Sequence, residues 1–230
     1  MIENQLNKLS EQLLLSVKME EDSASIQFEL ASLAFDSLKK HLFDDEKKKA
    51  FWINIYNAYF LILRKDREVK KSDIYKKQLI EIAGRLFSLD NVEHGILRKY
   101  RYKYSLGFFV NVMTSKFVKE HAVDSLDYRI HFALNCGAKS CPPIAFYNPE
   151  KVNEQLDLST QSFLEAESDF NDQKMIVSTT KLFLAYYWDF GGKKGIRKIF
   201  LSQLNKDISD YKIRYKKYSW EERLNNFVSD

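Results

Sequence analysis

Apolar residues recur every three or four positions along much of the chain, which is the spacing of an amphipathic helix. In the first such stretch, one face carries Ile2, Leu6, Leu9, Leu13 and Val17. The same spacing, at times less regular, predicts helices over residues 2–18, 24–42, 73–86, 91–98, 150–168, 181–188 and from 196 onward. Residues 106–117 are apolar but fit neither a helical nor a strand period.

A different pattern covers residues 50–63, which read A-F-W-I-N-I-Y-N-A-Y-F-L-I-L and carry no charge. Apolar side chains on every face predict a helix that is buried nearly all round. Asn54 and Asn57 are its two strongly polar side chains. A buried carboxamide without partners costs roughly 1–3 kcal/mol, so both must find hydrogen bonds within the protein.

Strands are predicted at three places, the first and third from alternation of apolar and polar residues and the second from a short apolar run after the Asn171-Asp172 turn. They are residues 129–135, 175–177 and 211–215. With 7 Gly and 3 Pro among 230 residues, the composition argues against a loop-rich all-β protein. We therefore predict an α+β fold, a predominantly helical single domain with a small, mainly antiparallel sheet. Residues 1–44 are expected to form a helical extension packed on a core domain of residues 45–230.

Composition excludes several classes of protein. The net charge of +4 arises from 36 basic and 32 acidic residues that are interspersed, which gives no reason to expect a nucleic-acid partner. No apolar run reaches the roughly 18 residues of a membrane span, and the first residues lack the pattern of a secretory signal. The sequence as given is typical of a cytoplasmic protein. A periplasmic or secreted protein from which a leader has been removed would show the same pattern.

The segment His131–Pro143, H-F-A-L-N-C-G-A-K-S-C-P-P, holds both cysteines. Cys136 lies where the predicted strand ends, and a thiol at such a break can be activated by nearby backbone N–H groups. One interpretation makes Cys136 a nucleophile with a histidine as base and a third, polar group that orients the histidine. His131 and Asn135 lie on the same face of the predicted strand. The other interpretation makes Cys136 a small buried apolar residue. Ser140, next to a lysine, is an alternative nucleophile.

The C-x4-C spacing of Cys136 and Cys141 is not the C-x-x-C of redox enzymes. Across a loop the two could still reach disulfide distance, so a reversible disulfide stays open. A zinc site that combines both cysteines with His94 and His131 lacks finger-like spacing. We predict neither a metal ion nor another cofactor.

A second polar cluster lies in E-H-G-I-L-R, residues 93–98. On a helix His94 and Arg98 share one face, and Glu93 is adjacent. The cluster fits a catalytic base beside an anion-binding arginine, and it equally fits a structural ion pair. Gly95 would let another segment or a ligand approach closely.

Taken together, these motifs resemble the family named domain of unknown function 547. The resemblance rests on three stretches above all: A-F-W-I-N-I-Y-N-A (50–58), V-E-H-G-I-L-R (92–98) and R-I-H-F-A-L-N-C-G-A-K-S-C-P-P (129–143). The segment 174–190 and the terminal tyrosine-rich strand are similar too, so it covers about residues 45–225. Members of that family occur as bacterial stand-alone domains and attached to other modules in eukaryotes. The resemblance implies no reaction.

Two functions follow from these residues. The first is a thiol-dependent hydrolase or acyl-transfer enzyme, with Cys136 as nucleophile, His131 or His94 as base, and Glu93, Asn54 or Asn57 orienting it. The second is a non-catalytic binding module in which the cysteine motif is structural. Either would act on a small-molecule or peptide ligand. Arg98, Asn135 and Ser140 complete the predicted site.

Overall fold

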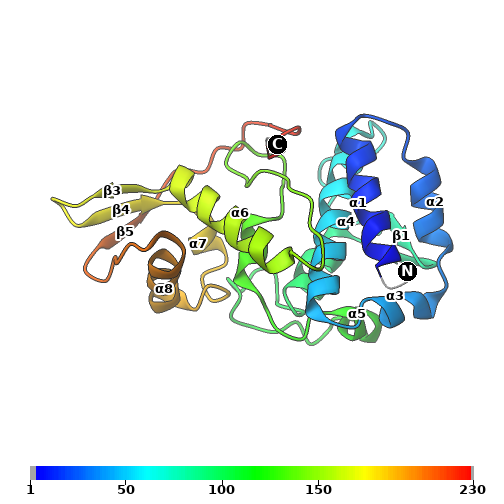
Figure 1. Ribbon diagram of the computed structural model, residues 1–230, viewed down its shortest axis with the longest axis horizontal. Helices are drawn as coiled ribbons and strands as arrows, with labels where there is room; N and C mark the ends of the chain where they lie inside the picture. Colours follow the sequence, from blue (N-terminus) through cyan, green and yellow to red (C-terminus); the bar gives the residue numbers. More distant parts are fainter. Residues whose placement is uncertain (1–3, 229–230) are drawn as a thin grey trace.

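The computed structural model describes residues 4–228 and has the predicted α+β, mostly helical architecture. The molecule is elongated, with a bundle of N-terminal helices at one end and a three-stranded sheet at the other (Figure 1). The α-helices are α1 (Gln5–Lys18), α2 (Ala24–Ser32), α3 (Phe35–His41), α4 (Asp45–Lys65), α5 (Lys116–His121), α6 (Val152–Glu167), α7 (Leu182–Ala185) and α8 (Gly192–Leu204).

Helix α4 is the centre of the larger hydrophobic core. Its N-terminus is capped by Asp44, whose carboxylate accepts a hydrogen bond of 2.8 Å from the Lys47 amide. From residue 48 to residue 61 every side chain of α4 is buried, which confirms the prediction of a helix enclosed on all sides. Helix α1 packs along it (Figure 1) through its predicted apolar face, which includes Leu6, Leu9 and Leu13.

The smaller core lies at the other end, beneath the three-stranded sheet. Strand β4 (Ile176–Thr179) pairs antiparallel with β3 (Asp169–Asn171) and parallel with β5 (Lys212–Tyr215). Helix α8 lies beside the sheet and α6 packs against α8 at the base of the strands (Figure 1), and phenylalanine side chains such as Phe183 and Phe200 belong to this core. Two of the three predicted strands, at residues 175–177 and 211–215, are thus present as β4 and β5.

The helix predicted over residues 73–86 is wrong. The segment contains an antiparallel hairpin of β1 (Ile80–Ile82) and β2 (Arg85–Phe87). Ala83 and Gly84 form its turn, both with positive φ, at 51° and 64°. Two successive positive φ angles are the geometry of a tight hairpin turn and cannot occur within an α-helix.

The strand predicted over residues 129–135 is also wrong, because a short 3-10 helix, η2 (Tyr128–Phe132), occupies its place. The Asp127 carboxylate accepts a bond of 3.1 Å from the Arg129 amide and starts the turn. His131 and Asn135 are polar residues of the alternating pattern, yet both are buried like their apolar neighbours. Ile130 packs into the larger core and Phe132 into the smaller one, so η2 joins the two.

The predicted helix at residues 91–98 is present as a π-helix, η1 (Asn91–Leu97). Its wider turns are frequent at functional sites. Within the described residues, no helix is both long and apolar enough to cross a bilayer.

Candidate functional site

A cavity of about 600 Å³ lies between α4, η1, α7 and two further segments. One is the loop that carries Cys136 and Cys141, here called the cysteine loop, and the other is the C-terminal segment around Tyr218 and Trp220. Four of the residues singled out in the sequence line it: Glu93, His94, His131 and Cys136. Asn54, Asn57, Arg98, Asn135 and Ser140 do not line this cavity. The structure therefore brings four candidates that are far apart in the chain to one cavity. The other five candidates are not part of its lining.

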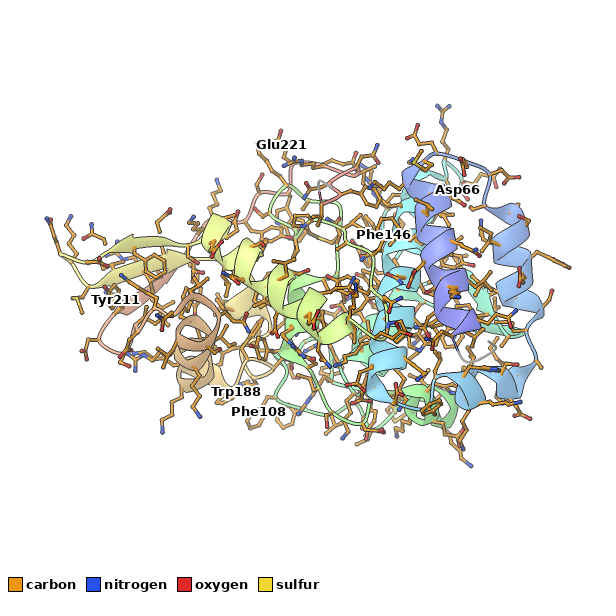
Figure 2. All side chains as sticks on the ribbon, in the orientation of Figure 1. Asp66, Phe108, Phe146, Trp188, Tyr211 and Glu221 are labelled. Carbon is orange, nitrogen blue, oxygen red and sulfur yellow. A yellow bond between two sulfur atoms is a disulfide. The ribbon has the colours of Figure 1, made fainter. Side chains whose placement is uncertain are left out.

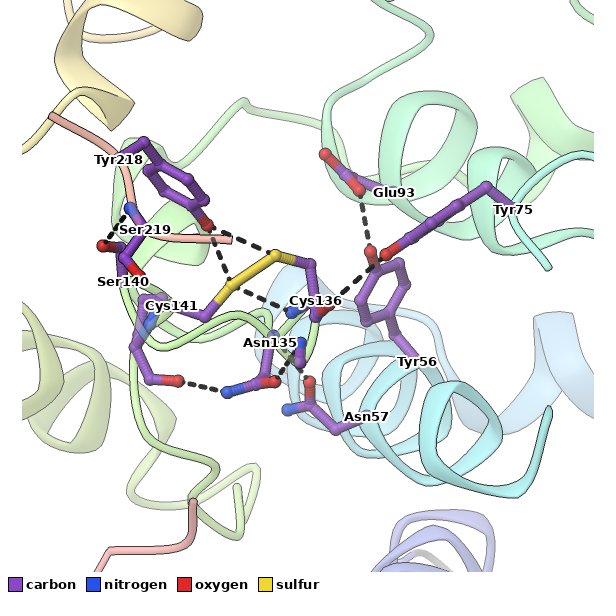
Figure 3. Close-up of a disulfide and its surroundings, with 12 residues drawn as sticks. Tyr56, Asn57, Tyr75, Glu93, Asn135, Cys136, Ser140, Cys141, Tyr218 and Ser219 are labelled. Carbon is purple, nitrogen blue, oxygen red and sulfur yellow. Dashed lines mark hydrogen bonds between the residues drawn. A yellow bond between two sulfur atoms is a disulfide. The ribbon is translucent and has the colours of Figure 1, made fainter. Parts of the chain in front are cut away.

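Cys136 and Cys141 are joined in a disulfide, with Cα atoms 6.2 Å apart (Figure 3). The Tyr218 hydroxyl lies 3.3 Å from the Cys136 sulfur and 3.1 Å from the Cys141 sulfur. Both cysteines line the cavity, and Cys136 is the more exposed of the two. The bond occupies both sulfurs, so neither cysteine is a free thiol. Among the described residues, no group of three or more His, Cys, Asp or Glu side chains could hold a metal ion.

The cysteine loop is held by buried amides (Figure 3). Asn57 donates to the Ala133 carbonyl and accepts from the Asn135 amide, both at 3.0 Å. The Asn135 side chain donates to the Pro142 carbonyl at 2.6 Å and accepts from the Gly137 amide at 2.6 Å. Asn57 and Asn135 thus fix the shape of the loop that carries the disulfide.

The other two polar candidates have anchoring contacts. Asn54 donates to the Tyr147 carbonyl at 2.8 Å and accepts from the Tyr147 amide at 3.0 Å. The Ser140 hydroxyl accepts a bond of 2.9 Å from the Ser219 amide, which ties the loop to the C-terminal segment. The contacts of Ser140 are those of a loop anchor.

His131 is paired with a residue that the sequence did not single out. Its Nε2 lies 2.8 Å from Oδ2 of Asp189, whose side chain is fully buried. A carboxylate can only accept, so Nε2 carries the proton and Nδ1 keeps its lone pair. The ring also stacks on Tyr186, with centroids 3.9 Å apart. Asp189 and Tyr186 fix both the tautomer and the orientation of His131.

Arg98 connects this pair to η1. Its Nε donates to the same Asp189 oxygen at 2.6 Å, and its Nη1 lies 2.8 Å from Nδ1 of His94. A guanidinium only donates, so Nδ1 of His94 must accept and Nε2 carries the proton. Both histidines are consequently Nε2–H tautomers, but the pairing differs: Asp189 takes the N–H of His131 and leaves its Nδ1 lone pair, while Arg98 takes the Nδ1 lone pair of His94 and leaves its N–H.

Glu93 is buried between two tyrosines. The Tyr56 hydroxyl donates to one oxygen at 3.0 Å and the Tyr186 hydroxyl to the other at 2.8 Å. Burial alone would raise the pKa of Glu93, but nearby His94 and Arg98 and the Tyr186 hydrogen bond outweigh it and hold the pKa at about 2. Glu93 is an anion anchored by hydroxyl donors.

Burial is the largest influence on the pKa values of His131 and His94. It lowers the pKa of His131 and of His94 below 6.5, against the opposing pull of Asp189 and Glu93 respectively. Burial raises the pKa of Asp189, but its hydrogen bonds to His131 and Arg98 prevail and the pKa lies below 3.8. Near neutral pH the cluster therefore holds two carboxylates, one guanidinium and two neutral imidazoles.

Three residues of the candidate site were not predicted from the sequence: Asp189, Tyr186 and Tyr218. A usable signal existed for Asp189, since it is the one carboxylate within the apolar stretch 182–190, and a charge in such a stretch needs a partner. No comparable signal distinguishes Tyr186 or Tyr218 among 13 tyrosines.

The fold and this cluster define an α+β protein with an ordered carboxylate–histidine pair beside a disulfide-lined cavity. The chain belongs to the family described as protein of unknown function, DUF547, whose model matches residues 40–164. The matched range includes α4, η1 and the disulfide loop, while Asp189, Tyr186 and Tyr218 lie beyond it. No curated protein and no solved structure matches the chain.

Proposed function

We propose that the protein is a thiol-dependent hydrolase or acyl-transfer enzyme that acts in its reduced state, with Cys136 as nucleophile and His131 as base. One observation carries the proposal: Cys136 and His131 line the same cavity, and Asp189 holds His131 in the tautomer that leaves Nδ1 free to accept a proton. Thiol and serine hydrolases use the same three groups: a nucleophile, a histidine base and an acidic residue that orients the base.

The reaction begins with opening of the disulfide. One thiol of a reductant attacks a sulfur of the disulfide and forms a mixed disulfide. A second thiol of the reductant then attacks that bond, so the reductant leaves as its own disulfide and two thiols remain on the protein. Cys136 then attacks the acyl carbon of the substrate as His131 takes the thiol proton. The leaving group departs with that proton, and water or another acceptor releases the acyl group from the thioester.

Two neighbours assist this chemistry. Burial raises the pKa of Tyr218 to about 12, so its hydroxyl stays protonated and can donate to a Cys136 thiolate. His94, with its proton on Nε2, supplies a donor at the cavity wall for the oxyanion that forms on the acyl oxygen. Glu93 and Arg98 position His94 and the Asp189–His131 pair.

The alternative is a binding module without catalysis. It is favoured by the disulfide and by the Asn57–Asn135 network, which give the cysteine loop one fixed shape suited to lining a pocket. In that function the disulfide stays closed, and reduction would loosen the pocket.

Two serine variants separate these functions, because each removes the disulfide but only one keeps the proposed nucleophile. We expect Cys141→Ser to hydrolyse p-nitrophenyl acetate without reductant, and wild type to do so only after reduction by dithiothreitol. Cys136→Ser should lose about 100-fold or more of this activity, and His131→Asn a similar factor. Equal rates for the two serine variants would contradict the proposal.

Iodoacetamide gives a second measurement that needs no substrate. In the reduced protein, Cys136 should be alkylated faster than Cys141 at neutral pH, and the difference should shrink in His131→Asn. Equal and slow labelling of both cysteines would favour the binding module.

A further inference from the structure

A second cavity, of about 730 Å³, adjoins the first. The two share Asp90, His94, Lys103 and Tyr104 in their walls. The second is formed by the β1–β2 hairpin, η1, the loop 101–115 and the start of α5. Because these residues contribute to both walls, the two cavities lie next to each other on either side of His94.

The walls of the second cavity are strongly basic. Five cations line it against two carboxylates: Lys76, Arg85, Arg101, Lys103 and Lys116, with Asp90 and Glu120. Both carboxylates are already paired, Asp90 with Lys103 at 2.7 Å and Glu120 with Lys116 at 3.8 Å. Among the described residues, no carboxylate lies within 4.0 Å of a charged nitrogen of Lys76, Arg85 or Arg101. Three positive charges are left over.

Two of these cations are held in place by uncharged contacts. The Arg85 guanidinium lies 4.8 Å above the Phe35 ring, and Arg101 donates to the Phe108 carbonyl at 3.3 Å. Neither contact neutralises a charge. The second cavity thus presents ordered cations to whatever enters it, which is the arrangement that binds phosphate or carboxylate groups.

The first cavity has the opposite character away from its polar cluster. Its remaining wall contains Lys181 and otherwise consists of apolar and aromatic side chains, among them Leu106, Leu134, Pro142, Leu182, Leu184 and Trp220. The Cys136–Cys141 disulfide lies in this wall. A long apolar group would be desolvated here, close to the sulfur that we propose as nucleophile.

We propose that the two cavities form one site for an ester or thioester whose acyl part is apolar and whose leaving part carries a phosphate. The acyl chain occupies the first cavity and the phosphate binds Lys76, Arg85 and Arg101 in the second. The reactive carbonyl then lies near the junction, beside His94. The order of events rests on the proposed function: the bond from Cys136 sulfur to the acyl carbon forms, the bond to the leaving oxygen or sulfur breaks, and the leaving group takes the proton from His131.

Binding to the oxidised protein tests the site without the reaction, because the disulfide form has no nucleophile. Decyl phosphate, decanol and inorganic phosphate are titrated by calorimetry below the micelle concentration of the alkyl phosphate. Decyl phosphate should bind with a dissociation constant about tenfold or more below that of decanol, because only it uses both cavities. The advantage should shrink as salt is raised.

The triple variant Lys76→Gln/Arg85→Gln/Arg101→Gln should raise the dissociation constant for decyl phosphate about tenfold or more and leave that for decanol unchanged. A matched control removes the same charge from α8, in Lys193→Gln/Lys194→Gln/Lys198→Gln, and should bind as wild type. Equal binding of decyl phosphate and decanol, or an unchanged triple variant, would overturn the proposal. If the ligands bind as expected but the reduced protein shows no activity, the proposed reaction is contradicted and the proposed binding site is not.

Two further ligands distinguish the source of the phosphate. Decanoyl-coenzyme A stands for a soluble nucleotide thioester and a decanoyl lysophosphatidic acid for a lipid. Tighter binding of the first assigns the site to nucleotide thioesters and tighter binding of the second to lipid phosphates. Failure of both to compete with decyl phosphate would overturn the assignment to esters and thioesters.

Discussion

Glu93, Arg98, His131 and Asp189 are buried together, and each depends on the others. The desolvation cost of buried charges is offset only when the charges are paired and hydrogen-bonded. Here Asp189 accepts from both Arg98 and His131, while Glu93 accepts from two tyrosines. The arrangement holds His131 and His94 in defined tautomers, which a surface ion pair could not do.

Asn57 offers a test of a single buried side chain. Asn57→Leu adds apolar volume to an apolar helix, yet it leaves the Ala133 carbonyl and the Asn135 amide without partners. We expect a loss of about 2 kcal/mol or more in the free energy of unfolding, measured by urea denaturation. The control is Gln161→Leu, an exposed amide on α6, which should change stability by less than about 0.5 kcal/mol. An Asn57→Leu variant as stable as wild type would show that these bonds contribute nothing net.

The need for such partners could be predicted from the residues alone. Two carboxamides within an uncharged helix had to be satisfied internally, and both are. Their partners could not be predicted, because the Ala133, Asn135 and Tyr147 backbone groups come from segments 76 to 93 residues away. Asp189 was missed for the same reason, since its role depends on long-range contacts with Arg98 and His131.

At the scale of elements, the π-helix η1 directs Glu93 and His94 into the cavity from adjacent positions. It is pressed against α5 at one point. A Cβ added to Gly95 would lie 2.5 Å from Cγ1 of Val118, well inside van der Waals contact. The absence of a side chain at residue 95 is therefore what allows α5 to pack on the element that carries the site, as the sequence suggested for this glycine.

This contact predicts coupling between residues 95 and 118. Gly95→Ala should destabilise the protein by about 1–3 kcal/mol through overpacking. In a Val118→Ala background the clash is gone and alanine's better helix propensity, worth up to about 1 kcal/mol, remains. Gly95→Ala should then be neutral or stabilising. Additive effects in the double-mutant cycle would contradict this close approach.

Elements with one clear period were predicted correctly, and those with a misleading period were not. The buried α4, the amphipathic α1 and the strands β4 and β5 follow their patterns. Residues 129–135 alternate apolar and polar side chains without a solvated face, since His131 and Asn135 are polar for reasons of the site. Residues 73–86 have apolar side chains at helical spacing, but the Ala83–Gly84 turn gives a β-hairpin there.

At the scale of the whole molecule, the site lies between the two hydrophobic cores. Segment η2 contributes Ile130 to the larger core and Phe132 to the smaller one, and His131 between them faces the cavity. The loop 101–115 closes the same region from outside. There Phe108 lies against Trp188, with ring centroids 5.3 Å apart (Figure 2). Perturbing the buried cluster should therefore affect the stability of the whole fold.

The stability of the whole protein should consequently fall as pH is lowered. The pKa values of His94 and His131 lie below their ordinary 6.5 in the folded state, because burial disfavours the charged imidazole. Below pH 6.5 the unfolded chain binds protons that the folded chain does not, so stability is full above that pH and is lost as pH falls toward the folded pKa values. Each histidine contributes a slope of up to about 1.4 kcal/mol per pH unit.

Urea midpoints measured from pH 7.5 to pH 5 check this expectation. The midpoint should fall over that range, and the slope should be smaller in His131→Asn, whose amide can still donate to Asp189 but does not titrate. Below pH 4.5 a further loss is expected as Glu93 and Asp189, whose folded pKa values are lowered, resist protonation that the unfolded chain accepts. A midpoint that stays constant between pH 7.5 and pH 5 would show that the two histidines are not held neutral by burial, and the tautomers on which the proposed base depends would lose their support.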